Sequence, residues 1–122
     1  MARSEDEQFL HDWVIRKIKE KNGRMYSEVN INPGDEQNYD LEGKYPDVVM
    51  VNHGQVVGII EVDTKETVDE SCVDKWKALS ELGAKLTLVV PKEEQKKARD
   101  LVWKSGLVAK VDIKFFDVHI GV

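Results

Sequence analysis

Apolar residues recur at helical spacing in three stretches of the chain. The first runs from about residue 4 to 21, where Ser4 followed by Glu7 forms a capping-box pattern at the expected N-terminus. The second covers about residues 68–82 and the third about residues 93–104. A glycine stands within two residues of the end of each stretch, as is typical of helix C-termini. The pattern therefore predicts three helices.

Between these stretches lie short apolar runs rich in Val and Ile, which predict buried strands. We expect strands at about residues 25–31, on both sides of residues 52–54, at 86–90 and at 111–118. The polar segment 32–44 contains a Pro-Gly pair and predicts a loop. The resulting order is α-β-β-β-α-β-α-β. It predicts a single α/β domain over residues 1–122, in which a mixed sheet is flanked by helices and an antiparallel meander leads into a βαβ crossover.

Acidic residues interrupt the two most apolar strands. Asp47 follows Pro46 at the start of one strand, and Glu61 and Asp63 stand at the end of the next. An ionised carboxylate in such a run needs a partner, because an unpaired buried charge is costly. These side chains are therefore either metal ligands or members of a buried charge network.

The connection between these two strands decides which residues meet. Residues 52–54 predict a three-residue hairpin loop, because glycine suits the left-handed third position of such a loop. This loop would pair Val51 with Gln55. Counting back from that pair, Asp47 falls opposite Ile59.

In this register the charged residues gather on one side of the sheet. Side chains alternate between faces along a strand, so Asp47, Glu61, Asp63 and Lys65 would share one face. Glu61 would be the diagonal neighbour of Asp47, about 7–8 Å away, which leaves room for a divalent cation between them. A two-residue turn would instead place Asp47 and Glu61 on opposite faces. A shift of one residue in the pairing of the two strands thus decides whether the predicted site can form.

Two helices each carry a charged residue on an apolar stripe. Lys75 lies three residues after Cys72 and four before Leu79, so it either leans over the carboxylates or snorkels to an edge. Glu7 lies on the line of Leu10 and Val14 in the first helix, so it either points inward or serves the capping box. By contrast, the histidines at positions 11, 53 and 119 show no zinc-like spacing, and the one at position 53 fits a turn.

The order α-β-β-β-α-β, together with Pro46-Asp47 at the second strand and Glu61 and Asp63 ending the third, resembles the PD-(D/E)XK nuclease superfamily. Its compact members include archaeal Holliday-junction resolvases and the nuclease domains of restriction enzymes. The resemblance covers nearly the whole chain and implies a restriction-endonuclease-like fold. It also implies divalent-metal-dependent cleavage of phosphodiester bonds, with DNA as the partner.

The resemblance also assigns roles to particular residues. It implies Mg²⁺ or Mn²⁺ ligation by Asp47, Glu61 and the carbonyl oxygen of Val62, and Glu7 matches an acidic residue often found on the first helix. We add Asp63 as a candidate third carboxylate, because a cation would relieve the repulsion among clustered carboxylates. Oxygen ligands of this kind suit Mg²⁺, which keeps several of its waters.

The chain departs from the family pattern at the lysine. The pattern places a lysine two residues after Glu61, where this chain has Asp63. Either Lys65 supplies the ammonium group in a motif shifted by two residues, or Lys75 supplies it from the helix, or cleavage has been lost. The sequence thus predicts a metal-dependent deoxyribonuclease or, as the alternative, a catalytically inactive nuclease-fold module that binds nucleic acid or a protein partner.

Composition adds a few limits. The chain has 122 residues, a net charge of −5 and a single cysteine, which fit one compact domain in a reducing, cytoplasmic environment. The acidic balance counts against tight non-specific DNA binding, although it does not exclude a nuclease. No apolar run approaches membrane-spanning length, and the acidic N-terminus argues against a secretory signal peptide.

A domain this small also suggests association. We expect a homodimer through the last strand, 111–118, or the third helix beside it, or else a place in a larger protein complex. Ile113, Phe115 and Phe116 offer apolar area there, and a terminal strand is often an edge that needs covering.

Overall fold

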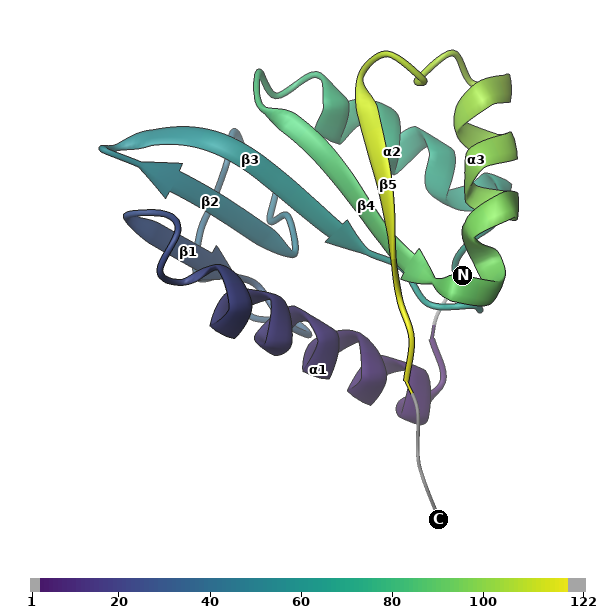
Figure 1. Cartoon of the computed structure of the whole chain (residues 1–122), viewed down its shortest axis with the longest axis horizontal. Helices are drawn as coiled ribbons and strands as arrows, with labels where there is room; N and C mark the ends of the chain where they lie inside the picture. The colour runs from purple at the N-terminus through teal and green to yellow at the C-terminus, as the bar shows by residue number, and fades with distance from the viewer. Residues whose placement is uncertain (1–2, 119–122) are drawn as a thin grey trace.

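The structure is a computed structural model that describes residues 3–118. It has an α/β fold in which three α-helices flank a five-stranded mixed, open sheet (Figure 1). Two short 3₁₀ turns precede the second and third helices. The elements are α1 (Glu5–Asn22), β1 (Glu28–Ile31), β2 (Val48–Asn52), β3 (Gln55–Val62), η1 (Glu70–Cys72), α2 (Val73–Ser80), β4 (Lys85–Pro91), η2 (Lys92–Glu94), α3 (Gln95–Lys104) and β5 (Val111–Phe116). The predicted order of helices and strands is confirmed.

The strands lie in the sheet in their order along the chain, from β1 to β5. The first three form an antiparallel meander, and β3, β4 and β5 run parallel to one another. The helices α2 and α3 supply the two crossovers that parallel neighbours require. As predicted, β5 is an edge strand; the homodimer through it remains a prediction.

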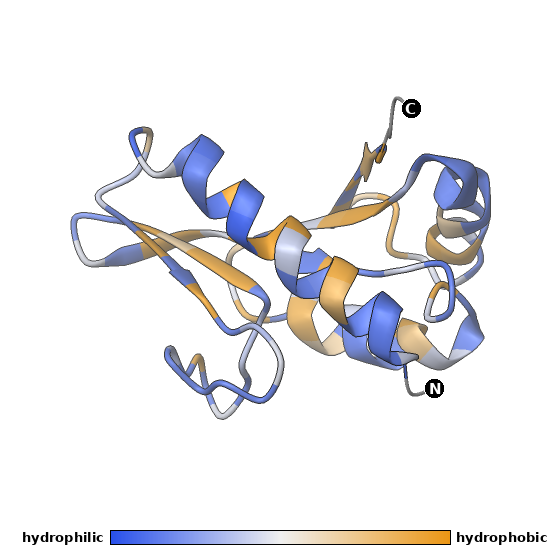
Figure 2. Cartoon of the chain, turned by 90° about the horizontal axis from the view of Figure 1, so that it is seen from below, coloured by the Kyte–Doolittle hydropathy of each residue, from blue (hydrophilic) through white to orange (hydrophobic). Residues whose placement is uncertain are grey.

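The helices cover the two faces of the sheet unequally. Helix α1 packs on one face, where its residues Val14 and Ile15 join a buried cluster with Val48, Ile60 and Val62. Helices α2 and α3 pack on the other face, over the larger cluster around Trp76, Leu79, Ala98, Val102, Ile59, Leu86 and Leu88. Figure 2 shows the strands behind α1 as long hydrophobic stretches, whereas α1 alternates between hydrophobic and hydrophilic positions. Strand β2 is apolar on both faces, because both are covered.

The β2–β3 connection differs from the three-residue loop expected from the sequence. Asn52 pairs with Gln55, so the turn contains only His53 and Gly54. Both turn residues have positive φ, 50° at His53 and 79° at Gly54, as a type I′ turn requires. The prediction of a three-residue loop, and of Val51 pairing with Gln55, is therefore wrong.

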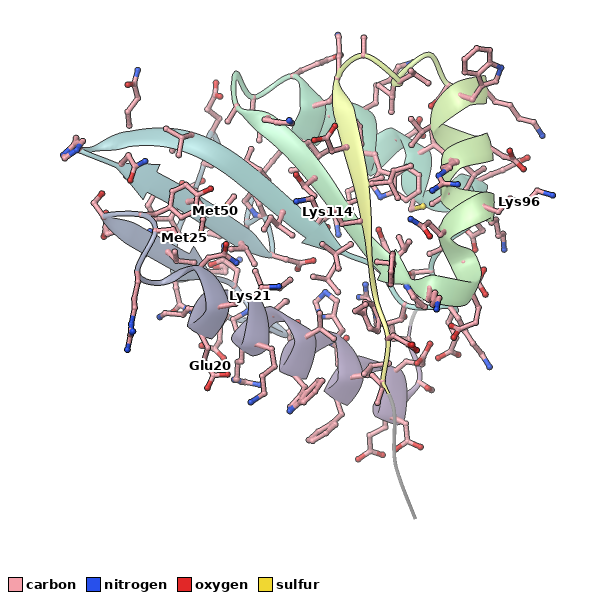
Figure 3. All side chains as sticks on the ribbon, in the orientation of Figure 1. Glu20, Lys21, Met25, Met50, Lys96 and Lys114 are labelled. Carbon is pink, nitrogen blue, oxygen red and sulfur yellow. The ribbon has the colours of Figure 1, made fainter. Side chains whose placement is uncertain are left out.

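A β-bulge places Asp47 and Glu61 on the same face of the sheet, which the shorter turn alone would not do. Beyond the turn, Val51 pairs with Val56 but Met50 pairs with Gly58, so Val57 is the extra residue on β3. Gly58 follows the bulge, and a Cβ atom there would lie 2.6 Å from Cε of Met50, the end of a flexible side chain that would have to shift (Figure 3).

The bulge sets the register at the far end of the hairpin. Val48 pairs with Ile60, and continuing this register places Asp47 opposite Glu61 rather than opposite Ile59 as expected. A two-residue turn alone would put the two carboxylates on opposite faces. The extra residue shifts the pairing by one and brings them to the same face, so the predicted meeting of Asp47 and Glu61 is confirmed by a different route.

Some element ends also differ from the expectation. Strand β1 begins at Glu28 rather than near residue 25, because residues 23–27 form a turn and bend after α1. Helix α2 begins only at Val73, after the 3₁₀ turn. Over residues 3–118, none of the helices has the combination of length and apolar character needed to cross a membrane.

Candidate functional site

Asp47 and Glu61 form the centre of the candidate site. The first residue immediately precedes β2 and the second lies near the end of β3, and their exposed fractions are only 6% and 1%. The backbone N–H of Asp47 donates to Oε1 of Glu61 over 3.1 Å. In return, Oδ2 of Asp47 accepts a hydrogen bond of 2.8 Å from the backbone N–H of Val62. The hairpin register thus holds both carboxylates side by side.

The lysine of the site comes from helix α2. The ammonium group of Lys75 pairs with Oε2 of Glu61, while its stem remains half-exposed. Lys65 is exposed and forms no ion pair within residues 3–118. Its predicted place on the carboxylate face is wrong, because β3 ends at Val62 and a turn follows, so strand alternation no longer applies. The predicted inward lean of Lys75 is confirmed.

Asp63 is buried, but its oxygens already have partners. Oδ2 accepts a hydrogen bond of 2.9 Å from the indole N–H of Trp76, and Oδ1 accepts one of 3.1 Å from the hydroxyl of Thr67. Arg3 lies 3.8 Å from the same Oδ1. These contacts give Asp63 an anchoring role between β3 and α2, and they leave it less available than Asp47 or Glu61 as a ligand.

The sequence analysis missed His11, which is the residue of α1 that reaches the site. Its Nε2 lies 3.0 Å from Oδ2 of Asp47 and its Nδ1 lies 2.9 Å from Oδ1 of Asp12. The same oxygen of Asp12 accepts a hydrogen bond of 3.0 Å from the backbone N–H of Gly34, which ties the loop after β1 to the helix. The position of His11, one turn after Glu7 and three residues before Val14, was a usable signal for an inward side chain.

Glu7 stands apart from this cluster. The N-cap is confirmed, since the N–H of Glu7 donates to Oγ of Ser4 over 3.3 Å. The reciprocal bond of a capping box is replaced, because the N–H of Ser4 donates to Oε1 of Glu66. The carboxylate of Glu7 accepts a hydrogen bond of 3.4 Å from the backbone N–H of Glu66, in the turn after β3. Its contacts therefore join α1 to that turn.

Burial and mutual repulsion shift the titration of the carboxylates. Burial raises the pKa of Glu61 to about 8, the charge of Asp47 adds to the shift, and Lys75 opposes it. Burial also raises the pKa of Asp63, against the hydrogen bond from Trp76. For Lys75, burial works to lower the pKa, but the charges of Glu61 and Asp47 outweigh it and the pKa is raised.

The pKa of His11 is set by the same competition between burial and neighbouring charges. Burial works to lower its pKa, but the hydrogen bond and charge of Asp47 and the hydrogen bond to Asp12 outweigh it, so the pKa is raised. The imidazole is therefore more easily protonated than a free one, and it can serve as a cation beside Asp47. Three acidic side chains (Asp47, Glu61 and Asp63) thus lie close to three basic ones (Arg3, His11 and Lys75) in the site.

A cleft of about 330 Å³ opens above the cluster. Arg3, His11, Asp47 and Lys75 line it together with residues 34–37, and Glu61 lies buried beneath. The loop segment brings two acidic residues, Asp35 and Glu36, to the cleft, so acidic as well as basic side chains line it. An anionic ligand that enters the cleft would meet the cations directly above Asp47 and Glu61.

The donor set fits a divalent cation in part. Asp47 and Glu61 offer hard carboxylate oxygens side by side, although Oε2 of Glu61 already pairs with the ammonium group of Lys75. The carbonyl oxygen of Val62 accepts a bond of 3.2 Å from Arg3, and Asp63 is engaged elsewhere. Within residues 3–118, no three His, Cys, Asp or Glu side chains are grouped as in a metal site. The fit is therefore to a cation that keeps most of its waters, held by two carboxylates.

Comparisons of the chain with protein-family models, with curated proteins and with solved structures found no match. The function of the site is therefore inferred from its geometry.

Of the other histidines, His53 occupies the β2–β3 turn as expected, and His119 lies outside the described residues.

Proposed function

We propose that this protein is a divalent-metal-dependent nuclease of the PD-(D/E)XK type that cleaves phosphodiester bonds in DNA. The observation that carries the proposal is the convergence of Asp47, Glu61 and Lys75 at one end of the sheet, beneath an open cleft. Two carboxylates and an ammonium group at this spacing are the parts that metal-assisted phosphodiester hydrolysis requires.

The fold supports the same proposal. The order of helices and strands, and the adjacency of β2 and β3, agree with the restriction-endonuclease-like arrangement that the sequence resembles. Lysine two residues after Glu61 is absent, but Lys75 brings an ammonium group to the same carboxylate from α2. Lys75 would thereby replace the lysine that the sequence pattern places on the strand.

Each residue of the cluster has a role in this scheme. Asp47 and Glu61 would hold Mg²⁺ or Mn²⁺, with the carbonyl of Val62 as a further oxygen donor. Such a cation polarises the scissile phosphate and lowers the pKa of a bound water. Lys75 lines the cleft, so its ammonium group is placed to stabilise charge on phosphate oxygens. Arg3 lines the same cleft and is placed to bind the phosphate backbone.

His11 would act as a positioning residue. Its contact with Oδ2 of Asp47 fixes one oxygen of that carboxylate, and its contact with Asp12 fixes the imidazole ring. Second-layer contacts of this kind orient ligating groups.

A specific observation also favours the alternative of a catalytically inactive module. Every predicted ligand group already contacts a basic side chain of the chain itself: Asp47 contacts His11, Glu61 contacts Lys75, and the carbonyl of Val62 contacts Arg3. The cluster is thus neutralised without a metal, which is how a structural charge network would be built. In that case the fold would bind nucleic acid or a protein without cutting.

Cleavage and cation binding distinguish the two functions. The protein would be incubated with Mg²⁺ or Mn²⁺ and single-stranded, double-stranded, branched and flapped DNA, beside Asp47→Asn and Glu61→Gln prepared identically. We expect cleavage by the wild type alone, and calorimetric Mn²⁺ binding that Asp47→Asn abolishes. Cleavage that persists in Glu61→Gln would reveal a contaminant, and equal Mn²⁺ binding by wild type and Asp47→Asn would exclude the metal site.

A further inference from the structure

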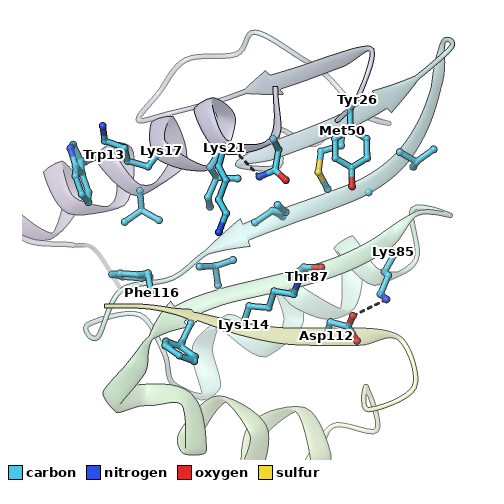
Figure 4. A pocket seen from close by; sticks show the side chains of 18 residues that line it. Trp13, Lys17, Lys21, Tyr26, Met50, Lys85, Thr87, Asp112, Lys114 and Phe116 are labelled. Atoms are coloured by element: carbon cyan, nitrogen blue, oxygen red, sulfur yellow. Dashed lines mark hydrogen bonds and ion pairs between the residues drawn. The ribbon is translucent and has the colours of Figure 1, made fainter. Parts of the chain in front are cut away.

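A second and larger hollow lies on the α1 face of the sheet, away from the carboxylates. This groove of about 540 Å³ runs between α1 and the strands β4 and β5, of which β5 is the edge strand (Figure 4). It shares no lining residue with the cleft above Asp47. It exists because one helix covers this face of the sheet while two cover the other.

The floor of the groove is mainly aliphatic. It is formed by Ile18 of α1 and by Met50, Ile60 and Val89 of the sheet. Trp13 and Phe115 stand at the margin with 42% and 48% of their surface exposed. Along α1 the lining extends from residue 13 to 22, which corresponds to a length of about 14 Å at 1.5 Å per residue.

The charge of the groove is opposite to that of the whole chain. Four lysines line it (Lys17, Lys21, Lys85 and Lys114) against one aspartate, Asp112, whereas the chain as a whole has a net charge of −5. Lys17 pairs with Glu20 over 3.1 Å, and Lys85 pairs with Asp112 over 2.7 Å.

The other two lysines have no such partner. Within residues 3–118, Lys21 and Lys114 form no ion pair. They extend from the helix and from β5 on opposite sides of the groove (Figures 3 and 4). An apolar floor between two unpaired cations is complementary to a ligand with an apolar face and acidic flanks.

We propose that this groove binds an acidic amphipathic helix of a partner protein. The helix would lie beside α1 over β4 and β5, with apolar side chains on the floor and Asp or Glu side chains at Lys21 and Lys114. It would give this face of the sheet a second covering helix, as α2 and α3 already give the other face. Helix-in-groove recognition of this kind uses apolar anchors at i, i+3, i+4 and i+7.

The lining favours a peptide over a nucleic acid strand. Bases stack on open aromatic faces, but the ring of Trp13 is covered by the ammonium group of Lys17, 5.5 Å from its centroid. The aliphatic side chains of the floor match leucine or isoleucine anchors, although Tyr26, Phe115 and Phe116 also line the groove.

A peptide selection with a charge-reversed counterpart tests the proposal. A displayed library of helical peptides of about 14 residues, long enough to fill the groove, would be selected on the wild type and counter-selected on Lys21→Glu/Lys114→Glu. We expect enrichment of peptides with an apolar stripe flanked by Asp and Glu. A synthetic representative should bind the wild type about tenfold or more tighter than the charge-reversed variant, because both complementary charges are lost.

The matched control is Lys96→Glu/Lys97→Glu, the same charge change on the exposed surface of α3, where Lys96 points outward in Figure 3. This variant should bind the representative as the wild type does. No enrichment over the counter-selected variant, or equal weakening by both double variants, would overturn the proposal. Loss in the groove variant of binding to a single-stranded oligonucleotide, with no peptide bound by the wild type, would assign the groove to nucleic acid instead. The readout is binding rather than cleavage, so the result is independent of the nuclease proposal.

Discussion

The ammonium group of Lys75 on α2 pairs with Oε2 of Glu61 on β3, which brings a helix lysine to a strand carboxylate. In the sequence pattern that this chain resembles, the lysine would stand on the strand itself, two residues after Glu61. Here that position is Asp63, whose oxygens bind Trp76 and Thr67. The nearest lysine along the chain, Lys65, lies beyond the strand and is exposed.

Lys75 and Lys65 therefore form a matched pair for mutagenesis. We expect Lys75→Met to lower the rate of DNA cleavage in Mn²⁺ by about 10²–10³-fold, the usual effect of removing one preorganised charge-stabilising group. Lys65→Met should change the rate less than about twofold, since its side chain is exposed and, within residues 3–118, forms no ion pair. Single-turnover cleavage, with circular dichroism to confirm folding, measures both. Equal losses in the two variants would contradict the assignment of the lysine to α2, and Lys75→Arg should restore part of the rate.

The raised pKa of Glu61 predicts how stability depends on pH. Its pKa rises from 4.5 to about 8 on folding, chiefly through burial, so the folded state holds this proton more tightly than the unfolded chain. The stability contributed is fully present below the unfolded pKa and is lost as pH rises through the folded value. Relative to Glu61→Gln, which cannot ionise, the wild type should lose stability steadily between those two values.

Urea denaturation of both proteins across this range, without divalent cations, measures the difference. The comparison with Glu61→Gln removes the contributions of the other titrating groups, provided that they titrate alike in both proteins. A difference that stays flat, or that favours the wild type increasingly as pH rises, would show that Lys75 dominates burial at this carboxylate.

The sequence was sufficient for the order of elements, because apolar spacing and helix-ending glycines depend only on local structure. Helical periodicity placed Lys75 on the apolar stripe of α2, but it left open whether the side chain leans over the carboxylates or snorkels to an edge. The sequence failed at the β2–β3 turn and at the bulge. The turn contains His53 and Gly54 alone, and Val57 is then an extra residue on β3, next to Gly58, which packs against Met50. The predicted loop was one residue too long, and the one-residue bulge was not predicted. These two errors cancelled, so Asp47 and Glu61 were correctly placed on the same face although the register was wrong.

The sequence likewise predicted some residues of the candidate site and missed others. Asp47 and Glu61 were identified because charges in apolar strands stand out. The helical position of His11 indicates an inward side chain, but it does not reveal the partner 36 residues later in the chain, which lies 3.0 Å away. Arg3 was missed for the same reason, since its contacts are with Val62 at the end of β3 and with Thr64 after it.

The anchoring of Asp63 by Trp76 can be tested through stability. Trp76→Phe removes the donor to a buried carboxylate and leaves a cavity in the α2–α3 side of the core, so we expect a loss of about 2–4 kcal/mol in the free energy of unfolding. In that background Asp63→Asn should cost less than it does in the wild type, because the hydrogen bond is already gone. A double-mutant cycle from urea denaturation gives the coupling, expected at about 0.5–3 kcal/mol. Strict additivity would show that the contact contributes nothing to stability.

The turn at His53 offers a test of the hairpin register itself. In the two-residue turn, His53 has a φ of 50°, a conformation that Asn adopts readily and that β-branched residues strongly resist. Its side chain is exposed, and its backbone N–H, which donates to Oγ of Ser27, is unchanged by substitution. We therefore expect His53→Asn to stabilise the protein by about 0.5 kcal/mol, and His53→Val to destabilise it by about 1–2 kcal/mol.

The two variants differ from the wild type only at a solvent-exposed side chain. A difference in stability between them therefore reports the backbone conformation at position 53. In a three-residue loop ending at Gly54, position 53 would be right-handed, and Val and Asn would differ little. Thermal and urea denaturation of the three proteins decide between these turns. Because the two-residue turn needs the bulge at Val57 to bring Asp47 and Glu61 to one face, a strong preference for Asn over Val at position 53 would support the register on which the whole site depends.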